Sequence, residues 1–305
     1  MRRFVISFLC FVCMTVAYCR DYHYNTKFSI NKKNFVDTID IEWHRNQIYI
    51  KGFVGDKPCR INFDTGSSMG MISENFLNDE YRHIGTLSSR DANGKVSPVK
   101  VVMLPDVRIG SLVLSHYPAT IRPKQPINVV YGNIGANYDL LLGFDLINKG
   151  LIVKIDTKAG KMIITDRQNF FHDKGYIADY RLVRYAPNLK INVFKDCYDE
   201  AIFDTGSPFL YEMSRNSIKH FMLWTPDFKS LVKNDSTGRK TVGIHSIEES
   251  SNNMMLLFEE LRILGFDFKD LSIGTTKGNS RIGAEILNYG SIIIDGKKRK
   301  ILFSA

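Results

Sequence analysis

Apolar and polar residues alternate along most of the chain, in short runs that are rich in Val, Ile and Tyr. Two examples are "QIYIKGFV" from residue 47 and "SIIID" from residue 291. This alternation is typical of β-strands that bury one face. Helical patterns are confined to short stretches such as "SENFLND" and "SRNSIKHF". The pattern therefore predicts a mostly β protein with few, short helices.

One part of this strand pattern occurs twice. The phrase "RINFDTGSS" places an aspartate, Asp64, after an apolar run, and "EAIFDTGSP" does the same at Asp204 in the second half of the chain. An apolar-Gly phrase follows each of them, "LLLG" ending at Gly143 and "SRIG" ending at Gly283. The separation between aspartate and glycine is identical in the two copies, since 143 − 64 equals 283 − 204. A repeat of this length predicts a duplicated domain, and 305 residues are enough for two lobes.

The first residues have the pattern of a secretory signal peptide. Arg2 and Arg3 precede the apolar stretch "FVISFLCFVCMTVA", which is shorter than the roughly 20 residues that cross a bilayer. Small residues at Ala17 and Cys19 offer a cleavage point. We therefore expect an exported protein, periplasmic or secreted, with no membrane span after the signal is removed. An uncleaved anchor is one alternative; another is lipid attachment at Cys19, although the bulky Tyr18 occupies a position where that motif expects a small residue.

The signal pattern and the repeat together divide the chain into four segments. We expect the signal peptide at residues 1–19, an N-terminal lobe at 20–165, a linker at 166–187 and a C-terminal lobe at 188–305. The linker holds the last residues before the second set of strand-like runs.

Composition and charge exclude several classes of function. The net charge of +9 comes from scattered Lys and Arg, without the basic stripe interleaved with aromatics that nucleic-acid binding needs, so we expect no nucleic-acid partner. The seven histidines have no close metal-ligand spacing, and the cysteines left after signal removal, Cys59 and Cys197, cannot build a Cys-rich zinc site. We expect no metal, and we favour two unpaired structural thiols over a disulfide bridge.

The paired aspartates predict acid-base chemistry. A single Asp-Thr-Gly-Ser phrase would serve as an ordinary turn. Two such loops from homologous lobes would bring two carboxyls face to face, where like charges cannot both ionise readily. One carboxylate could then activate a water molecule while its protonated partner donates to a substrate carbonyl.

These phrases resemble the motifs of retropepsin-like aspartic peptidases, with two such domains in tandem in one exported chain. In aspartic proteases two carboxyls share one proton, which is the arrangement described above. The resemblance implies a bilobal, mostly β acid-protease fold whose two closed-barrel-like lobes are related by a pseudo-two-fold axis. It implies that Asp64 and Asp204 are the catalytic dyad of an aspartic-type endopeptidase. Such an enzyme needs no cofactor and cuts peptide or protein substrates in extended conformation.

The resemblance also gives roles to neighbouring residues. It implies that the two threonines lock the loops together by reciprocal hydrogen bonds, that two glycines line the substrate channel, that two serines donate to the carboxylates, and that two further glycines pack behind the loops. In the same order these residues are Thr65 and Thr205, Gly66 and Gly206, Ser67 and Ser207, and Gly143 and Gly283. If the serines donate, they stabilise the charged form of the dyad, which predicts a pH optimum on the acid side of neutrality.

Flap hairpins are expected near "SRDANGKVS" and "NDSTGRKTV", with tips at Gly94 and Gly238. The second half departs from the family form, because Asn279 and Glu285 stand where the first half has Asp139 and Asp145. A monomer is expected, since the fused halves remove the need for a dimer to build the site.

Two rival interpretations concern the same loops. A catalytically silent peptide-binding protein could use the same cleft, because function has to be argued from the site and not from the fold. The phrase "GSSMG" also fits the G-x-S-x-G pattern of serine hydrolases, with Ser68 as nucleophile. That fold requires alternating strands and long helices, which the sequence lacks, so we treat this second match as chance.

Overall fold

The structure, a computed structural model, describes residue 24 and residues 26–77, 81–122, 138–235, 239–242, 245–250 and 253–305. The expected signal peptide and the hairpin tip expected at Gly238 lie outside these residues. In the described part of the chain, every helix is too short or too polar to cross a bilayer.

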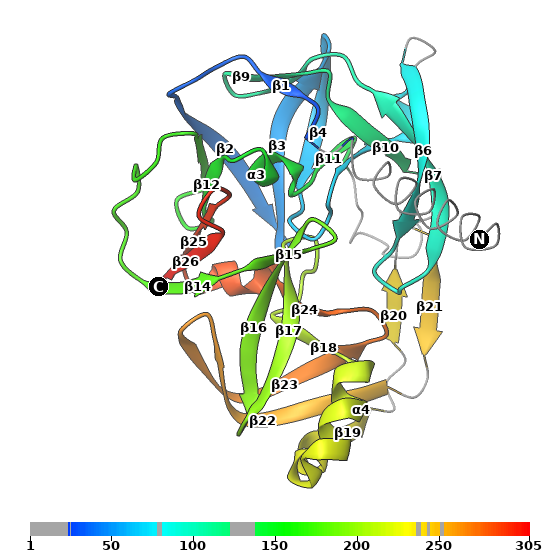
Figure 1. Ribbon diagram of the computed structural model, residues 1–305, viewed down its shortest axis with the longest axis vertical. Coiled ribbons are helices and arrows are strands. Elements are labelled where there is room, and N and C mark those ends of the chain that lie inside the picture. Colours follow the sequence, from blue (N-terminus) through cyan, green and yellow to red (C-terminus); the bar gives the residue numbers. More distant parts are fainter. Residues whose placement is uncertain are drawn as a thin grey trace, which may run out of the picture.

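The chain is mostly β and forms two lobes, one above the other (Figure 1). Strand β2 (Val36–His44) illustrates why its residues form a strand: Ile39 and Ile41 are buried while Asp40 and Glu42, one position on from each, are exposed. This alternation matches the two-residue period of a strand with one face on the core. The mostly β, bilobal fold predicted from the sequence is therefore confirmed.

Strands of the first half form most of a 16-stranded sheet. Its path runs β14-β26-β25-β12-β13-β2-β3-β4-β11-β5-β10-β7-β6, and three further strands, β1, β8 and β9, pair at its side. Besides β2, the first half contains β1 (Ser29–Ile30), β3 (Gln47–Val54), β4 (Lys57–Phe63), β5 (Gly70–Ser73), η1 (Glu74–Phe76), β6 (Arg82–Arg90), β7 (Val96–Met103), β8 (Val107–Ile109), β9 (Leu112–Ser115), β10 (Pro118–Arg122), β11 (Leu140–Leu142), α3 (Asp145–Asn148), β12 (Ile152–Asp156) and β13 (Lys161–Thr165). The other strands on the path are β14 (Tyr176–Asp179), β25 (Ser291–Asp295) and β26 (Lys300–Ser304).

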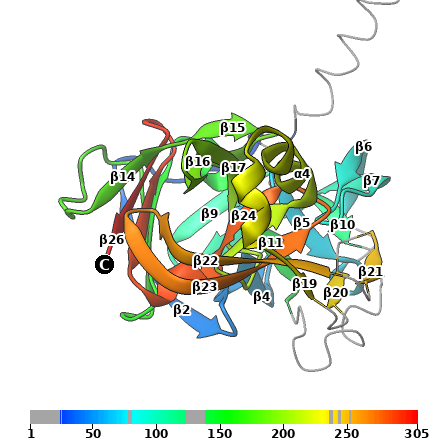
Figure 2. The same cartoon turned by 90° about the horizontal axis from the view of Figure 1, so that it is seen from below.

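The second half forms an eight-stranded sheet in the order β15-β16-β17-β24-β18-β23-β22-β19, and a separate pair, β20 and β21. Its elements are β15 (Arg181–Val183), β16 (Ala186–Phe194), β17 (Cys197–Asp204), β18 (Tyr211–Ser214), α4 (Arg215–Trp224), η2 (Pro226–Leu231), β19 (Val232–Asp235), β20 (Arg239–Val242), β21 (Ile247–Ser250), β22 (Asn253–Ile263), β23 (Phe266–Thr276), β24 (Ser280–Gly283) and η3 (Ala284–Asn288). Figure 2 shows the same two lobes from below.

Neither sheet closes on itself within the residues that the structure describes. The path of the larger sheet ends at β14 and β6, and that of the smaller one at β15 and β19. Because these end strands have a neighbour on one side only along their path, the closed-barrel-like form expected for each lobe is not what the structure shows.

Both halves place the same pair of strands beneath the Asp-Thr-Gly loop. Strand β11 runs parallel to β4, with Leu142 beside Phe63, and β24 runs parallel to β17, with Ile282 beside Phe203. In both pairs of strands the paired residues are the same number of positions apart in the sequence, since 142 − 63 equals 282 − 203. This is also the separation of aspartate and glycine in each copy of the repeat, so the spacing seen in the sequence is that of two paired strands.

The halves are joined by strands from both. Strand β12 pairs antiparallel with β25, and β14 pairs with β26. Residues 166–187, expected as the linker, contain β14 and β15, of which β15 pairs with β16. The connection between the lobes is therefore held by backbone hydrogen bonds to both sheets.

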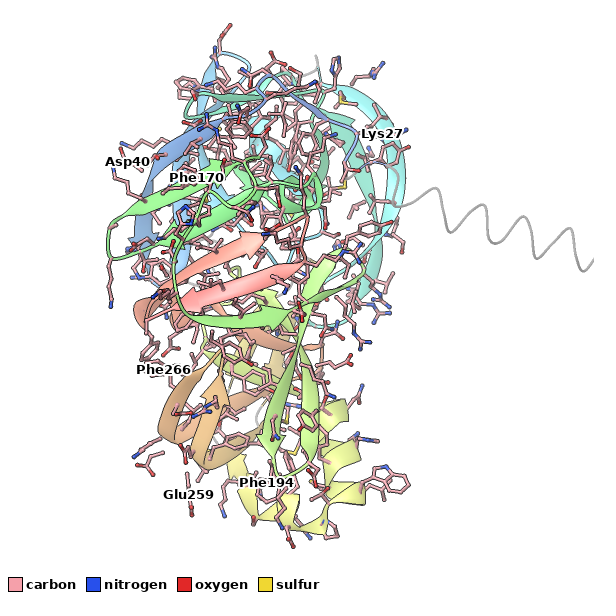
Figure 3. The ribbon with its side chains drawn as sticks, turned by 60° about the vertical axis from the view of Figure 1, so that its left-hand side comes forward. Lys27, Asp40, Phe170, Phe194, Glu259 and Phe266 are labelled. Carbon is pink, nitrogen blue, oxygen red and sulfur yellow. The ribbon has the colours of Figure 1, made fainter. Side chains whose placement is uncertain are left out.

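Apolar side chains fill the space around the strands, and aromatic rings pack in the second lobe, where Figure 3 shows Phe194 and Phe266. The Phe194 ring lies 5.9 Å from that of Phe228, edge to face. Cys59 and Cys197 are both buried and free. This confirms the prediction of two unpaired thiols.

Candidate active site

Two loops lie at the ends of equivalent strands. Asp64 directly follows β4, and Asp204 is the last residue of β17. In each loop the backbone N–H of the serine three positions on donates to the carbonyl of the aspartate, at 3.3 Å for Ser67 and 3.0 Å for Ser207. The residue before each aspartate, Phe63 or Phe203, is fully buried. The core thus anchors each strand, and a tight turn at its end presents the carboxyl.

The two threonines join these loops. The backbone N–H of Thr65 donates to the hydroxyl of Thr205 at 3.0 Å, and the backbone N–H of Thr205 donates to the hydroxyl of Thr65 at the same distance. Each hydroxyl also donates across the pair, from Thr65 to the Phe203 carbonyl at 2.7 Å and from Thr205 to the Phe63 carbonyl at 2.9 Å. This is the reciprocal pattern that the family resemblance implied.

The glycines after the threonines lie against the opposite aspartates. A Cβ atom built on Gly66 would lie 2.3 Å from the carboxyl carbon of Asp204, and one on Gly206 would lie 2.5 Å from that of Asp64. Side chains do not approach so closely, so only glycine permits this arrangement. These glycines let the two carboxyls come together, and their expected role in lining a substrate channel stays a prediction.

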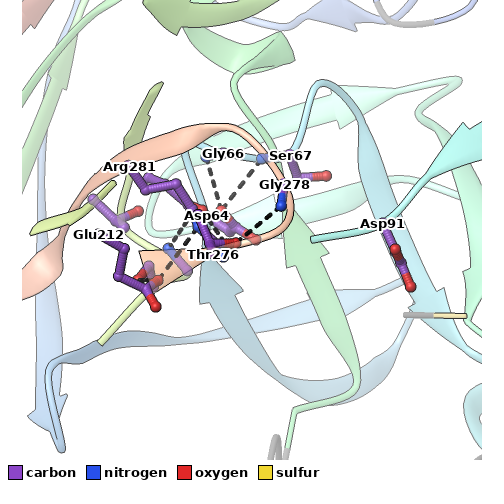
Figure 4. A network of polar contacts seen from close by, with 12 residues as sticks. Asp64, Gly66, Ser67, Asp91, Glu212, Thr276, Gly278 and Arg281 are labelled. Carbon is purple, nitrogen blue, oxygen red and sulfur yellow. Dashed lines mark hydrogen bonds and ion pairs between the residues drawn. The ribbon is translucent and has the colours of Figure 1, made fainter. Parts of the chain in front are cut away.

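The two carboxyls influence each other, and Figure 4 shows the polar contacts around Asp64. The pKa of Asp64 is raised well above its usual value, first by burial, then by the negative charge of Asp204 and by a hydrogen bond with its carboxyl. Backbone N–H groups of Gly66, at 2.8 Å, and Ser67, at 3.3 Å, act in the opposite direction because they stabilise the ionised form. Two carboxyls this close cannot both ionise readily, so the arrangement favours a proton shared by the pair.

Both serine hydroxyls point to other partners than the aspartates. The hydroxyl of Ser67 donates to the Met69 carbonyl at 2.8 Å, and that of Ser207 donates to the Glu212 carboxylate at 3.4 Å. The expectation that these hydroxyls donate to the dyad is therefore corrected. The hydroxyl of Ser67 finds its acceptor two positions on in the same loop, and that of Ser207 finds it on β18. Backbone N–H groups donate to the aspartates in their place.

Two further glycines pack behind the loops, as the resemblance implied. A Cβ atom on Gly143 would lie 2.7 Å from the Ser67 carbonyl oxygen, and one on Gly283 would lie 2.6 Å from that of Ser207. The N–H of the following residue, Phe144 or Ala284, donates to the same serine carbonyl at 2.7 Å. A glycine is needed in both halves because the loop backbone passes directly over it.

The flanking acidic positions differ between the halves. The carboxyl of Asp139 accepts from the backbone N–H of Arg60 at 2.9 Å, and Asp145 is buried behind the loop, where burial raises its pKa to about 7. In the second half Glu285 is half-buried, and burial raises its pKa as well.

The first flap expected from the sequence is the β6–β7 hairpin. Gly94 at its tip has a φ of +86°, which suits glycine in a tight turn. The Asp91 carboxyl accepts from the hydroxyl of Ser246 at 2.6 Å and from the backbone N–H of His245 at 3.2 Å, so the tip contacts the loop between β20 and β21. In Figure 1 the β20–β21 pair lies directly below the lower end of the β6–β7 hairpin. The second expected flap, "NDSTGRKTV", lies partly outside the described residues.

Sequence reasoning missed four side chains near the loops. Gln47 donates to the Gly206 carbonyl at 3.0 Å, and Asn46 donates to the Pro208 carbonyl at 2.8 Å, so the β2–β3 turn supports the second loop. Arg281 and Glu212 form an ion pair beside Asp204 (Figure 4). The signal that could have found this pair is the charged residue in "SRIG", where the first half has an apolar one in "LLLG".

Comparison with known proteins finds a matching family model and a similar fold. Residues 50–146 match the family model described as "Aspartyl protease". The fold is similar to that in the crystal structure of an aspartic proteinase from Irpex lacteus, with a TM-score of 0.53 and 11% sequence identity, over 89% of this chain and 97% of that chain. No curated protein sequence matched the chain.

The resemblance to retropepsin-like aspartyl proteases is thereby confirmed for residues 50–146 by the sequence match, and the fold of most of the chain is similar to that of an aspartic proteinase. The second retropepsin-like domain of the expected tandem stays a prediction.

Proposed function

We propose that the protein is an aspartic endopeptidase in which Asp64 and Asp204 hydrolyse peptide bonds with an activated water. The observation that carries the proposal is the approach of the two carboxyls, each against the glycine of the opposite loop. The threonine hydrogen bonds fix this approach, because both threonines are fully buried and each bonds to the other. Fixed geometry of this kind lowers the cost of reaching the reactive arrangement.

The proposed reaction needs a pair that holds one proton. The ionised carboxyl takes a proton from water while the water oxygen forms a bond to the substrate carbonyl carbon. The protonated carboxyl gives its proton to the carbonyl oxygen, which has gained the electron pair of the C=O bond. The tetrahedral intermediate then breaks its C–N bond, and the leaving nitrogen takes a proton from the pair. No cofactor takes part in these steps.

The proposed substrate is a peptide segment in extended conformation, which would lie between the dyad and the β6–β7 hairpin. The contact of Asp91 with Ser246 supports this, since it holds the hairpin tip against a loop of the other lobe. We also propose that the protein is exported, on the basis of its N-terminal sequence pattern alone.

Cleavage of a diverse peptide pool between acid and neutral pH tests the proposal. The parent protein should cut, and Asp64→Asn and Asp204→Asn should each abolish cutting while circular dichroism shows the same fold. Asp56→Asn serves as the matched control, because it makes the same chemical change at an exposed aspartate.

Activity that survives both dyad substitutions would contradict the proposal. If a well-folded parent cuts nothing, the alternative is a silent peptide-binding protein. In that case a transition-state analogue with a hydroxyl at the scissile position should bind no more tightly than the matching peptide.

A further inference from the structure

A buried cation lies beside one of the two carboxyls. In Arg281, on β24, the Nη1 atom is 4.0 Å from the Oδ2 atom of Asp204, and the side chain exposes 10% of its surface. Its Nη2 atom donates to the hydroxyl of Thr276 at 2.9 Å, and its Nε atom lies 3.4 Å from the Oε2 atom of Glu212. The guanidinium is therefore held in place from two sides while it faces the dyad (Figure 4).

The first half has no such charge at the matching positions. At the offset that separates Asp64 from Asp204, the counterparts of Arg281 and Glu212 are Leu141 and Ile72. Both of these are apolar and buried. The two loops thus differ in their surroundings: an ion pair borders the loop of Asp204, and apolar side chains border that of Asp64.

An arginine at this position affects where charge resides on the pair. The guanidinium stays protonated at any pH at which the protein is folded. An opposite charge about 4 Å from a carboxylate favours its ionised form, and the effect is larger where water is largely excluded. Other charged and titratable groups lie near the pair. The pKa of Tyr138 is raised first by burial and in part by the charge of Asp64, while Arg122, which lies over its ring, lowers it. The charge of Glu212 opposes that of Arg281.

We infer that Arg281 is a positioning residue that holds the negative charge of the pair on Asp204 and so leaves the proton on Asp64. This inference rests on the proposed function and deepens it. Asp204 then takes the proton of the attacking water, and Asp64 gives its proton to the carbonyl oxygen of the substrate. The proton taken up by Asp204 is then available for the leaving nitrogen when the C–N bond breaks.

The electrostatics of Asp64 agree with this assignment. Burial and the charge of Asp204 raise its pKa well above the usual range, which is the direction expected when the negative charge of the pair lies on Asp204. Glu212 has the opposite effect to Arg281, because by pairing with Arg281 it reduces the net positive charge beside Asp204.

Two substitutions should therefore act in opposite directions on the acid limb of kcat/KM, which reports the first ionisation of the pair. Arg281→Met removes the cation, so the limb should move to higher pH by about one unit. Glu212→Gln removes the opposing charge, so the limb should move to lower pH. Arg281→Lys keeps the charge and should restore most of the parent profile.

A matched control is Arg108→Met, which removes an arginine that pairs with the exposed Asp56 on the first lobe. Its profile should equal that of the parent. If the Arg281–Glu212 pair had a purely structural role, Arg281→Met and Glu212→Gln would both lower activity without moving the acid limb in opposite directions. Shifts of the acid limb in the same direction, or no shift, would therefore overturn the inference.

A direct titration separates this inference from the proposed function. Carboxyl ¹³C signals of Asp64 and Asp204, assigned with the two Asp→Asn variants, should show Asp204 ionising first in the parent and the order becoming less distinct in Arg281→Met. This readout needs no cleavage, so it still decides the matter if the protein proves not to be a peptidase. Asp64 ionising first in the parent would overturn the inference even if peptides are cut.

Discussion

Thr65 and Thr205 hydrogen bond to each other symmetrically across the two halves of the chain, each backbone N–H donating to the other's hydroxyl at 3.0 Å. Both side chains are fully buried. A buried donor that loses its acceptor has no water to replace it, so the two halves depend on each other at this point. The relationship explains how two carboxyls from opposite halves of the sequence can be held in one geometry.

Substituting either threonine by valine should destabilise the protein by about 1–3 kcal/mol, because an N–H and a carbonyl of the opposite half lose their partner. The double variant should cost less than the sum of the two, since both changes break one network. Urea unfolding of Thr65→Val, Thr205→Val and the double variant measures this. Thr86→Val, at an exposed position of β6, is the control and should change stability little. Strict additivity would show that the two sites are not coupled.

Alanine in place of Gly66 or Gly206 should abolish peptide cleavage. The added methyl group would lie 2.3 Å or 2.5 Å from the opposite carboxyl carbon and would push the two carboxyls apart. Gly85→Ala is a suitable control, because its methyl group would meet the hydroxyl of Tyr24, the end of a side chain, at 2.7 Å. Peptide turnover and thermal unfolding should be measured together, and an active Gly66→Ala variant would contradict the close approach of the carboxyls.

The two loops of this site could be predicted from the sequence because their parts are local. An apolar run followed by Asp-Thr-Gly specifies a strand and a turn, and the spacing of Asp64 and Gly143 corresponds to the pairing of β4 with β11. Hydroxyl partners were harder to predict. Whether Ser207 reaches Asp204 or Glu212 depends on side chains from β18, which local sequence does not place.

The contact of a charged side chain with a residue far away in the sequence also could not be predicted from the sequence pattern. Arg281 could be read as an odd polar residue in a strand, but its approach to Asp204 follows only from the parallel pairing of β24 with β17. The contact between Asp91 and Ser246 joins hairpins that lie in different halves of the chain. Neither hairpin contains a repeated phrase from which the contact between them could be predicted.

Asp91→Ala should release the tip of the β6–β7 hairpin. Besides Ser246 and His245, the carboxyl accepts from the backbone N–H groups of Asn93 at 3.0 Å and Lys95 at 2.8 Å, so its loss opens both the turn and the contact between hairpins. Amide hydrogen exchange should become faster at residues 91–96 and 245–246 and stay unchanged in β4. Ser88→Ala, elsewhere on the same hairpin, should leave both regions as in the parent. Unchanged exchange at the tip would show that Asp91 does not hold it.

Asp145 should make the stability of the fold depend on pH near neutrality. Burial raises its pKa to about 7 in the folded protein, against 3.8 for an aspartate in an unfolded chain, so between these values the folded state binds more protons than the unfolded state. Stability from this carboxyl is therefore largest at low pH and is lost as pH rises towards and through 7, by on the order of 4 kcal/mol. Asp145→Asn cannot ionise and should flatten this part of the curve, whereas Asp106→Asn, at an exposed position, should not. Urea unfolding of the three proteins at intervals from pH 4 to 8 measures the effect, and parallel curves for the parent and Asp145→Asn would mean that Asp145 ionises as readily in the folded protein as in the unfolded chain.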